Sequence, residues 1–159
     1  RRSAEQPMIP GVRLQQIMIS EFRLTRRVQF YETDTAGIVH FSVFFRYMEE
    51  AEHAMWRAAG LSIAPQGAPV GFPRGATTFE VFKPLRFSDE FEVLLRITRK
   101  SARSLSYSAT IEKDGDIAAH GTLTVACVST RSGEPMRGTV IPNEIADRFE
   151  VATSEGTKA

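Results

Sequence analysis

The amino-acid sequence predicts one domain of the α+β class, in which an antiparallel sheet wraps around a single long helix. A short stretch of alternating polar and apolar residues comes first, one long helical pattern follows, and about four strand patterns come after it. Strand and helix patterns do not alternate along the chain, so nothing demands the parallel sheet of repeated strand–helix units. With 159 residues, of which 42% are hydrophobic and 25% charged, the chain is long enough to bury one substantial core.

The chain is predicted to begin with an arm that is followed by one strand. Residues 1–20 contain two prolines and no sustained hydrophobic period, so they are interpreted as an N-terminal arm. The domain itself is predicted to span residues 21–130. In residues 21–30 apolar side chains alternate with polar and charged ones, which is the pattern of a half-buried strand. A turn-rich break at residues 31–37 follows this strand.

A long amphipathic helix is predicted for residues 42–59. Its apolar residues recur at spacings of three and four, which places them on one broad face that another element must cover. These residues are Phe44, Met48, Ala51, Met55 and Ala59, with Phe45 and Trp56 widening the stripe. Ser42 suits the N-cap position, and Gly60 suits the position just past the C-terminus. A helix of about 17 residues is about 25 Å long, so strands of about seven or eight residues match its length.

Four more strands are predicted after a long loop that is rich in Pro, Gly and Ala. The loop covers residues 62–75, and the strand patterns follow at residues 77–82, 90–97, 105–112 and 117–129. The pair Asp114-Gly115, between the last two strands, is a strong hairpin signal. Residues 131–159 are predicted to form a C-terminal tail with a short helix near residues 143–149.

The composition limits the partners that the protein is expected to have. Twenty Lys and Arg against 19 Asp and Glu give a formal net charge of +1, so we expect neither nucleic acid nor a membrane as a partner. No apolar stretch reaches the length of a membrane span, and residues 1–10 lack the apolar core of a signal peptide, which favours the cytoplasm. The single cysteine, Cys127, lies in an apolar run and is interpreted as a core residue. The three histidines and this cysteine show no ligand spacing, so no metal site is expected.

The segment most relevant to function joins the first strand to the long helix. Within it Asp34 lies in a turn, Gly37 permits a positive φ, and the helix begins a few residues later. The first turn of a helix offers unpaired backbone N–H groups that can stabilise an oxyanion, and a nearby carboxylate can act as a base or a nucleophile. This arrangement suits acyl transfer. Taken alone, however, Asp and Gly at this spacing are also ordinary turn residues.

The order of residues in and after this turn resembles that of a known family. The run Asp34-Thr-Ala-Gly-Ile-Val-His-Phe41, followed by aromatic residues in the helix and an acid at Glu49, is similar to the signature of 4-hydroxybenzoyl-CoA thioesterases and related bacterial acyl-CoA thioesterases. The similarity covers residues 22–130 and is strongest at residues 28–61. It implies a hotdog fold, with the antiparallel sheet wrapped around one central helix. It also implies hydrolysis of an acyl- or aryl-CoA thioester to the free acid and CoA, so CoA is part of the substrate and no cofactor is expected.

The resemblance assigns site roles by position. Asp34 corresponds to the catalytic aspartate, as nucleophile or general base, and Gly37 corresponds to the glycine of the turn. The oxyanion-binding amide falls on the backbone N–H of Phe41 or of His40. Because relatives often have Tyr or Trp where this chain has His40, both a hydrogen bond to substrate and a simple wall residue stay open for its side chain.

The resemblance also implies the contacts to CoA and the assembly. Arg103 and Ser104 open a strand as a basic-polar pair and are the expected CoA contacts, with Lys100 or Arg99 as substitutes. The carrier of the thioester is CoA or an acyl-carrier protein. A sheet with an open edge favours a homodimer paired edge to edge, and a dimer of dimers is common in such families.

Two other functions stay open. One is a hotdog-fold hydratase or dehydratase acting on acyl thioesters, because His40-Phe41 resembles the His-Phe-Pro start of some dehydratases. In this chain, however, Ser42 replaces the proline. The other is a non-catalytic acyl-CoA-binding module. The turn from Asp34 to Gly37 favours hydrolysis over both.

Overall fold

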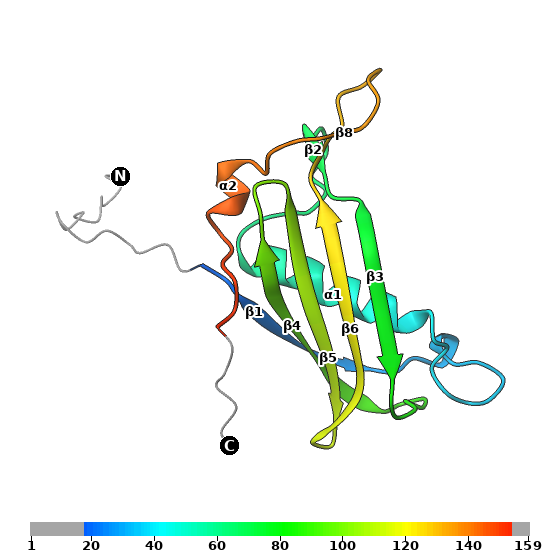
Figure 1. Cartoon of the computed structure of the whole chain (residues 1–159). Coiled ribbons are helices and arrows are strands. Elements are labelled where there is room, and N and C mark those ends of the chain that lie inside the picture. Colours follow the sequence, from blue (N-terminus) through cyan, green and yellow to red (C-terminus); the bar gives the residue numbers. More distant parts are fainter. Residues whose placement is uncertain (1–17, 154–159) are drawn as a thin grey trace, which may run out of the picture.

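The computed structural model describes residues 18–153 (Figure 1). Its elements, in chain order, are β1 (Glu21–Arg27), the 3-10 helix η1 (Phe30–Glu32), α1 (Val43–Ala58), β2 (Val70–Gly71), β3 (Arg74–Val81), β4 (Glu90–Lys100), β5 (Ser104–Lys113), β6 (Asp116–Ala126), β7 (Val128–Ser129), β8 (Arg137–Gly138) and α2 (Asn143–Ala146). The strand, long helix and following strands expected from the sequence are therefore present. The predicted arm at residues 1–20 lies outside the described residues except for its last three.

One antiparallel sheet of five strands wraps around α1 (Figure 1). The strand order is β1-β4-β5-β6-β3, so β1 and β3 form the two edges. Register shifts interrupt the pairing of β4 with β5, of β5 with β6 and of β3 with β6. Such irregularities bend strands and increase their twist, which helps long strands curl around a helix. This is the predicted α+β class and, by its helix held inside one antiparallel sheet, the hotdog fold.

The central helix begins and ends within one residue of the bounds that the sequence predicts. Ser42 occupies the N-cap position, but its hydroxyl bonds to His40 Nδ1 at 2.8 Å instead of capping the helix. Gly60 has φ of +78°, the left-handed conformation that ends helices and that glycine adopts without strain. The buried face of α1 consists of Phe44, Tyr47, Met48, Ala51, Glu52, Ala54, Met55 and Trp56.

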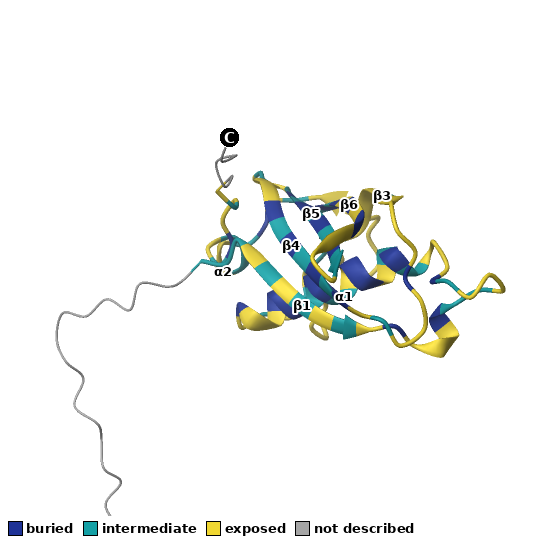
Figure 2. Ribbon diagram, turned by 90° about the horizontal axis from the view of Figure 1, so that it is seen from below, coloured by how far each residue is buried: buried dark blue, intermediate teal, exposed yellow. Residues whose placement is uncertain are grey.

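The inner face of the sheet and the apolar residues on the buried face of α1 form one core, and the buried Glu52 is paired with Arg74 of β3. Along β4 and β5 buried and half-buried residues alternate, which Figure 2 shows as alternating colours, and the buried ones belong to one cluster with the apolar residues of α1. On β5 the outward positions are hydroxyl residues from Ser104 to Thr110, and Ser106 is hydrogen-bonded to Thr124 of β6 at 2.9 Å. Alternation of period two thus directs apolar groups to the core and hydroxyls to the outer face.

Strand β3 is the exposed edge of the sheet. Its residues are all exposed except Phe79, whose ring packs against the rings of Phe44 and Phe45 with centroids 5.7 and 5.5 Å away. The partner of Phe79 on β6 is Gly121, where an added Cβ would lie 2.6 Å from the Thr78 carbonyl oxygen. Phe79 therefore fixes the register of β3 against β6, while the outer edge of β3 keeps unpaired backbone groups.

The C-terminal segment, predicted as a tail, lies against the domain through its described residues, up to residue 153. It contains α2 within the range predicted for a short helix, and Ile141 and Phe149 are buried in the main core. Lys100 donates to the carbonyl oxygens of Ala146 (2.6 Å) and Phe149 (2.9 Å). The packed unit thus extends beyond the boundary predicted at residue 130. Within residues 18–153, no helix is long and apolar enough to cross a membrane.

The predicted hairpin turn between β5 and β6 can be compared with backbone angles. Asp114 and Gly115 both have positive φ, of 52° and 80°, as a two-residue hairpin loop of type I′ requires. They join β5 to β6, which pair up to Lys113 and Asp116. The hairpin predicted from these two residues is therefore present.

Candidate active site

Asp34 lies at the start of a tight loop between η1 and α1. Its N–H donates to the Ile38 carbonyl oxygen at 2.9 Å, and its own carbonyl oxygen accepts the Gly37 N–H at 2.9 Å. Gly37 has φ of +76°, so a side chain at this position would be strained. An antiparallel bridge between Thr33 and Val39 closes the base of the loop. Backbone bonds therefore hold Asp34 in one place.

The carboxylate of Asp34 is half-buried and only partly used by the loop. Its Oδ1 accepts the Ala36 N–H at 2.8 Å. No hydrogen bond or ion pair within residues 18–153 involves Oδ2. One oxygen thus orients the carboxylate, and the other is available to a substrate or a water molecule.

The two amides predicted as alternative oxyanion donors differ in their bonding. The His40 N–H donates to the Glu32 carbonyl oxygen at 3.0 Å, so it is already used. The Phe41 N–H makes no hydrogen bond within the described part of the chain. Because it lies just before the first residues of α1, the positive end of the helix dipole adds to its potential for binding an anion. This geometry favours Phe41 over His40 as the amide donor.

The side chain of His40 belongs to the helix start. Its Nδ1 bonds to the Ser42 hydroxyl at 2.8 Å, and its ring lies 4.6 Å from that of Phe41. The residue is exposed, so its other ring nitrogen faces solvent or a ligand. Both roles left open by the sequence fit this position.

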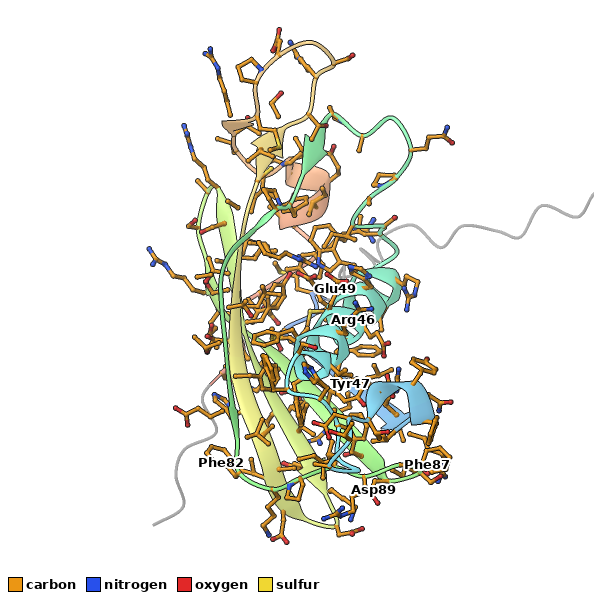
Figure 3. The ribbon with its side chains drawn as sticks, turned by 90° about the vertical axis from the view of Figure 1, so that its right-hand side faces the viewer. Arg46, Tyr47, Glu49, Phe82, Phe87 and Asp89 are labelled. Carbon is orange, nitrogen blue, oxygen red and sulfur yellow. The ribbon has the colours of Figure 1, made fainter. Side chains whose placement is uncertain are left out.

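Exposed aromatic side chains surround the loop of Asp34. Phe30 and Phe87 contact each other edge to face with centroids 5.8 Å apart, and Tyr31 and Phe41 are 80% and 69% exposed. Figure 3 shows Phe82 and Phe87 at this same end of the molecule. A depression of about 350 Å³ lies beside the loop, lined by Tyr31, Glu32, Thr33, His40, Ser42, Val43 and Arg46. Exposed aromatic rings gathered around one loop are typical of binding surfaces.

The residues predicted to contact CoA lie at the opposite end of the sheet. Arg103 lies in the turn between β4 and β5, and Ser104 begins β5, where its hydroxyl is hydrogen-bonded to Ser101 at 2.7 Å. Asp34 lies beside the other end of β4, where Ile38 bridges to Arg86. Strand β4 has 11 residues, so about 30 Å separates its ends. Within one chain, the site of Asp34 and the predicted CoA contacts are therefore far apart.

Lys100, the third predicted CoA contact, is engaged elsewhere. Its ammonium donates to the carbonyl oxygen of Ala146, at the end of α2, and to that of Phe149, three residues later. Arg103 is exposed and makes no ion pair within residues 18–153. Of the predicted basic contacts, Arg103 is thus the better placed to receive a phosphate.

A partly buried ion-pair network behind the loop was not predicted from the sequence. Glu32 of η1 pairs with Arg26 of β1, and Arg26 also pairs with Glu50 of α1. The sequence pattern could have indicated this network, because alternation along the first strand places Arg26 on the same inward face as Phe22 and Leu24. A charge at such a position needs a buried partner.

Glu32 is expected to stabilise the protein more at neutral pH than in acid. Burial alone would raise the pKa of Glu32, but hydrogen bonds from Arg26 and the Gln29 N–H outweigh it and hold the pKa below its ordinary 4.5. A carboxyl group whose pKa is depressed by folding contributes stability above its unfolded pKa and loses it as the pH falls through the folded pKa. The difference in free energy of unfolding between the native protein and Glu32→Gln should be largest at neutral pH and shrink below about pH 4.5. Urea denaturation across this range measures it, and a constant difference would contradict the ionised pair.

Cys127 is expected to resist thiol reagents in the folded protein. The residue is fully buried, and burial raises the pKa of its thiol above the ordinary 9.0. Because the thiolate is the reactive form, both effects slow alkylation. Labelling by iodoacetamide should be slow in buffer and complete in urea, as judged by mass spectrometry. Rapid labelling of the folded protein would show that the thiol is accessible.

The described residues also contain no group of three or more His, Cys, Asp or Glu side chains that could hold a metal ion. A half-buried carboxylate and an unpaired amide at the start of a helix held in an antiparallel sheet can act on an acyl carbonyl group. The long helix held inside one antiparallel sheet makes the protein a hotdog-fold protein. A family model of the Thioesterase-like superfamily matches residues 28–149. The chain therefore belongs to the Thioesterase-like superfamily.

Individual relatives agree with this family. A curated protein of Aquifex aeolicus named "Putative esterase" is 35% identical over 129 residues, which cover 79% of this chain and 95% of that protein. A crystal structure of a hypothetical protein from Aquifex aeolicus is 31% identical, with a TM-score of 0.75 and coverage of 81% and 99%. A mutant 4-hydroxybenzoyl CoA thioesterase complexed with 4-hydroxybenzoyl CoA is 15% identical, with a TM-score of 0.73 and coverage of 83% and 100%, and shares the fold.

Proposed function

We propose that the protein is an acyl-CoA thioesterase that uses Asp34 and the Phe41 N–H to hydrolyse an acyl- or aryl-CoA to the free acid and CoA. The proposal is carried by two groups near the start of α1. The Asp34 carboxylate is oriented by one oxygen and leaves the other without a hydrogen bond in the described residues, and the Phe41 N–H makes no hydrogen bond there either. The family match supports hydrolysis of a thioester. The substrate's carbonyl oxygen would lie at the Phe41 N–H, with Asp34 beside the carbonyl carbon.

Two chemical routes fit this placement. In the first, Asp34 attacks the carbonyl carbon, the C–S bond breaks, and CoA leaves as the thiol after gaining a proton. The mixed anhydride that results is then hydrolysed by water. In the second, Asp34 takes a proton from a water molecule that attacks the same carbon, and the C–S bond breaks as in the first route. Both develop an oxyanion that an amide donor stabilises.

A homodimer paired through β3 would bring the separated parts of the site together. Antiparallel pairing of two copies of β3 places the Arg74 end of one strand beside the Val81 end of the other. The Arg103 turn lies at the Arg74 end of the sheet, and the Asp34 loop lies at the Val81 end. CoA bound at Asp34 of one protomer could then reach the partner's Arg103. The exposed outer edge of β3 supports this assembly, and a dimer of dimers is compatible with it.

The remaining expectations belong to the same proposal. CoA enters as part of the substrate, and no separate cofactor is needed for either route. An acyl-carrier protein could present the same thioester. A cytoplasmic location and the lack of nucleic-acid and membrane partners belong to the same proposal, and the formal net charge of only +1 supports the lack of such partners.

Release of free thiol from a panel of CoA thioesters tests the proposal. The panel contains benzoyl and hydroxybenzoyl, short-chain and long-chain acyl-CoAs, and a matched set on an acyl-carrier protein. We expect turnover of at least one member, and the preferred member defines the acyl group. Failure with every member would refute the proposed function. Absorbance of an enoyl thioester, formed from a 3-hydroxyacyl-CoA without thiol release, would instead identify the dehydratase.

A further inference from the structure

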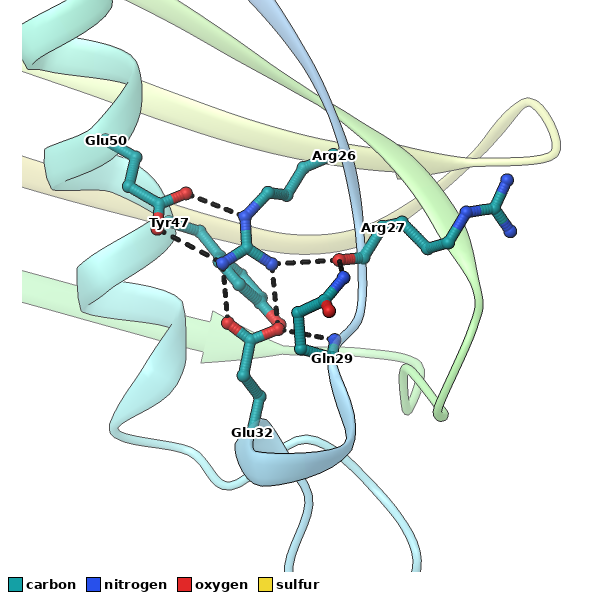
Figure 4. A network of polar contacts seen from close by, with 6 residues as sticks. All are labelled: Arg26, Arg27, Gln29, Glu32, Tyr47 and Glu50. Atoms are coloured by element: carbon teal, nitrogen blue, oxygen red, sulfur yellow. Dashed lines mark hydrogen bonds and ion pairs between the residues drawn. The ribbon is translucent and has the colours of Figure 1, made fainter.

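The carboxylate of Glu32, two residues before Asp34, accepts four hydrogen bonds (Figure 4). Its Oε1 accepts from Arg26 Nη1 (2.7 Å), the Gln29 N–H (2.7 Å) and the Tyr47 hydroxyl (3.1 Å). Its Oε2 accepts from Arg26 Nη2 at 2.7 Å. Glu32 is only 5% exposed. A carboxylate with this many short bonds is held in a single orientation.

Arg26 completes the network by joining three elements. Its Nε and Nη2 donate to Glu50 of α1 at 2.8 and 3.1 Å, and its Nη1 donates to the Arg27 carbonyl oxygen at 2.9 Å. Together with the two bonds to Glu32, all five of its N–H donors are used. Its guanidinium also lies 4.9 Å from the centre of the Tyr47 ring. Strand β1, the 3-10 helix η1 and helix α1 are thus fixed to one another at this point.

The backbone of Glu32 connects the network to both predicted catalytic groups. Its carbonyl oxygen accepts the His40 N–H at 3.0 Å, which closes the loop that begins at Asp34. Phe41, whose amide is the predicted oxyanion donor, follows directly in the chain. Movement of Glu32 would therefore change the distance between the Asp34 carboxylate and the Phe41 N–H.

We propose that Glu32 is a positioning residue of the thioesterase site, held by Arg26, Glu50 and Tyr47, which sets the geometry of Asp34 relative to the Phe41 amide. This inference rests on the proposed function. It assigns Glu32 no contact with the substrate, because its carboxylate is buried and its bonds are directed to the protein.

Stability alone does not account for this network. Two carboxylates share one guanidinium, and taking Glu32 and most of Arg26 out of water offsets much of the stability that their attraction contributes. What the network provides is rigidity at the point where the loop leaves the sheet. Displacement of a catalytic group by about 1 Å lowers turnover by about a hundredfold, so rigidity there has a direct catalytic effect.

The test uses two tyrosines whose hydroxyls are both buried on the inner side of the sheet. Tyr47 donates to Glu32, whereas Tyr107 of β5 accepts the Trp56 Nε1–H at 3.1 Å, away from the loop. Tyr47→Phe and Tyr107→Phe remove the same atom from equally buried sites. Both variants should lower the free energy of unfolding, measured by urea denaturation, by a similar amount. Only Tyr47→Phe should lower kcat, by about 3- to 10-fold with KM changed by less than about twofold.

Glu32→Gln is the stronger variant. It keeps the shape of the side chain but replaces one acceptor oxygen by an amide that cannot accept from Arg26, so we expect kcat to fall about 10- to 100-fold at nearly constant KM. Native kcat in both Tyr47→Phe and Glu32→Gln would overturn the inference. An equal loss of kcat in Tyr107→Phe would also overturn it, because general destabilisation would then explain the effect. If Glu32→Gln does not fold, the two tyrosine variants decide the question.

Asp34→Asn, assayed in parallel with the same CoA thioester, separates this inference from the proposed function. If Asp34→Asn is inactive while Glu32→Gln and Tyr47→Phe turn over normally, only the positioning role of Glu32 fails. If Asp34→Asn keeps native turnover, the assignment of Asp34 fails first.

Discussion

Asp34→Asn should lower kcat for CoA thioester hydrolysis by about 10²–10⁴-fold while leaving the fold intact. An amide is neither a nucleophile nor a base at neutral pH, so both proposed routes lose their reacting group. The amide oxygen of Asn can still accept the Ala36 N–H that Asp34 Oδ1 accepts at 2.8 Å, so the loop keeps its geometry. Single-turnover and steady-state kinetics on the preferred CoA thioester measure the change.

The matched control for this variant is Asp116→Asn. Asp116 is exposed at the start of β6 and pairs with Lys83 at 2.7 Å, and no side-chain hydrogen bond or ion pair within residues 18–153 joins it to the loop. The same chemical change at Asp116 should leave kcat within about twofold of native, as expected for a surface ion pair. Circular dichroism of both variants checks that each is folded. Native turnover in a folded Asp34→Asn protein would remove Asp34 from the mechanism.

The fold was predictable because its periodicities are local and strong. The helix stripe from Phe44 to Ala59 and the hairpin signal at Asp114-Gly115 reappear in the structure. The spacing of apolar residues indicates which face of an element is buried. One long helix among antiparallel strands is compatible with only a few architectures. The C-terminal segment could not be predicted in this way. Its two buried residues, Ile141 and Phe149, are isolated in sequence and reach the core only through tertiary contacts.

The site was predictable in part. Asp34, Gly37 and the start of the helix follow from a motif, and the structure places them in one loop. The choice between the amides of His40 and Phe41 could not be made from sequence, because it depends on which N–H a distant carbonyl oxygen already accepts. The role of Glu32 was missed for the same reason. Its partner Arg26 lies on another element, and only the fold brings the two together.

Trp56→Ala should lower the free energy of unfolding by about 3–5 kcal/mol, the loss expected when a large aromatic side chain is removed from a core. Trp56 is the only tryptophan of the chain and is fully buried. Its ring packs against Phe72 and Phe149, with centroids 4.9 and 5.1 Å away. Removing it would leave a cavity between α1, the loop before β3 and the C-terminal segment. Urea denaturation followed by circular dichroism measures the loss.

Trp56→Phe separates the volume of the ring from its hydrogen bond. This variant keeps most of the packing but leaves the Tyr107 hydroxyl without the Nε1–H donor at 3.1 Å, which should lower the free energy of unfolding by about 1–3 kcal/mol. If the loss of this hydrogen bond accounts for the destabilisation, the double variant Trp56→Phe with Tyr107→Phe should lose less free energy of unfolding than the two single variants lose in sum.

A second consequence of the Trp56 contacts concerns the C-terminal segment. Because Phe149 rests on Trp56 and its carbonyl oxygen accepts from Lys100, the segment at residues 141–149 is held by the same core as the helix. Hydrogen exchange in Trp56→Ala should therefore speed up in this segment more than in the Asp34 loop, whose backbone bonds are made within the loop, to Glu32 and to Leu85 rather than to the neighbours of Trp56. If residues 141–149 keep their protection from hydrogen exchange while the helix is destabilised, Lys100 and Ile141 are sufficient to hold the segment. The contact with Trp56 would then serve the helix alone.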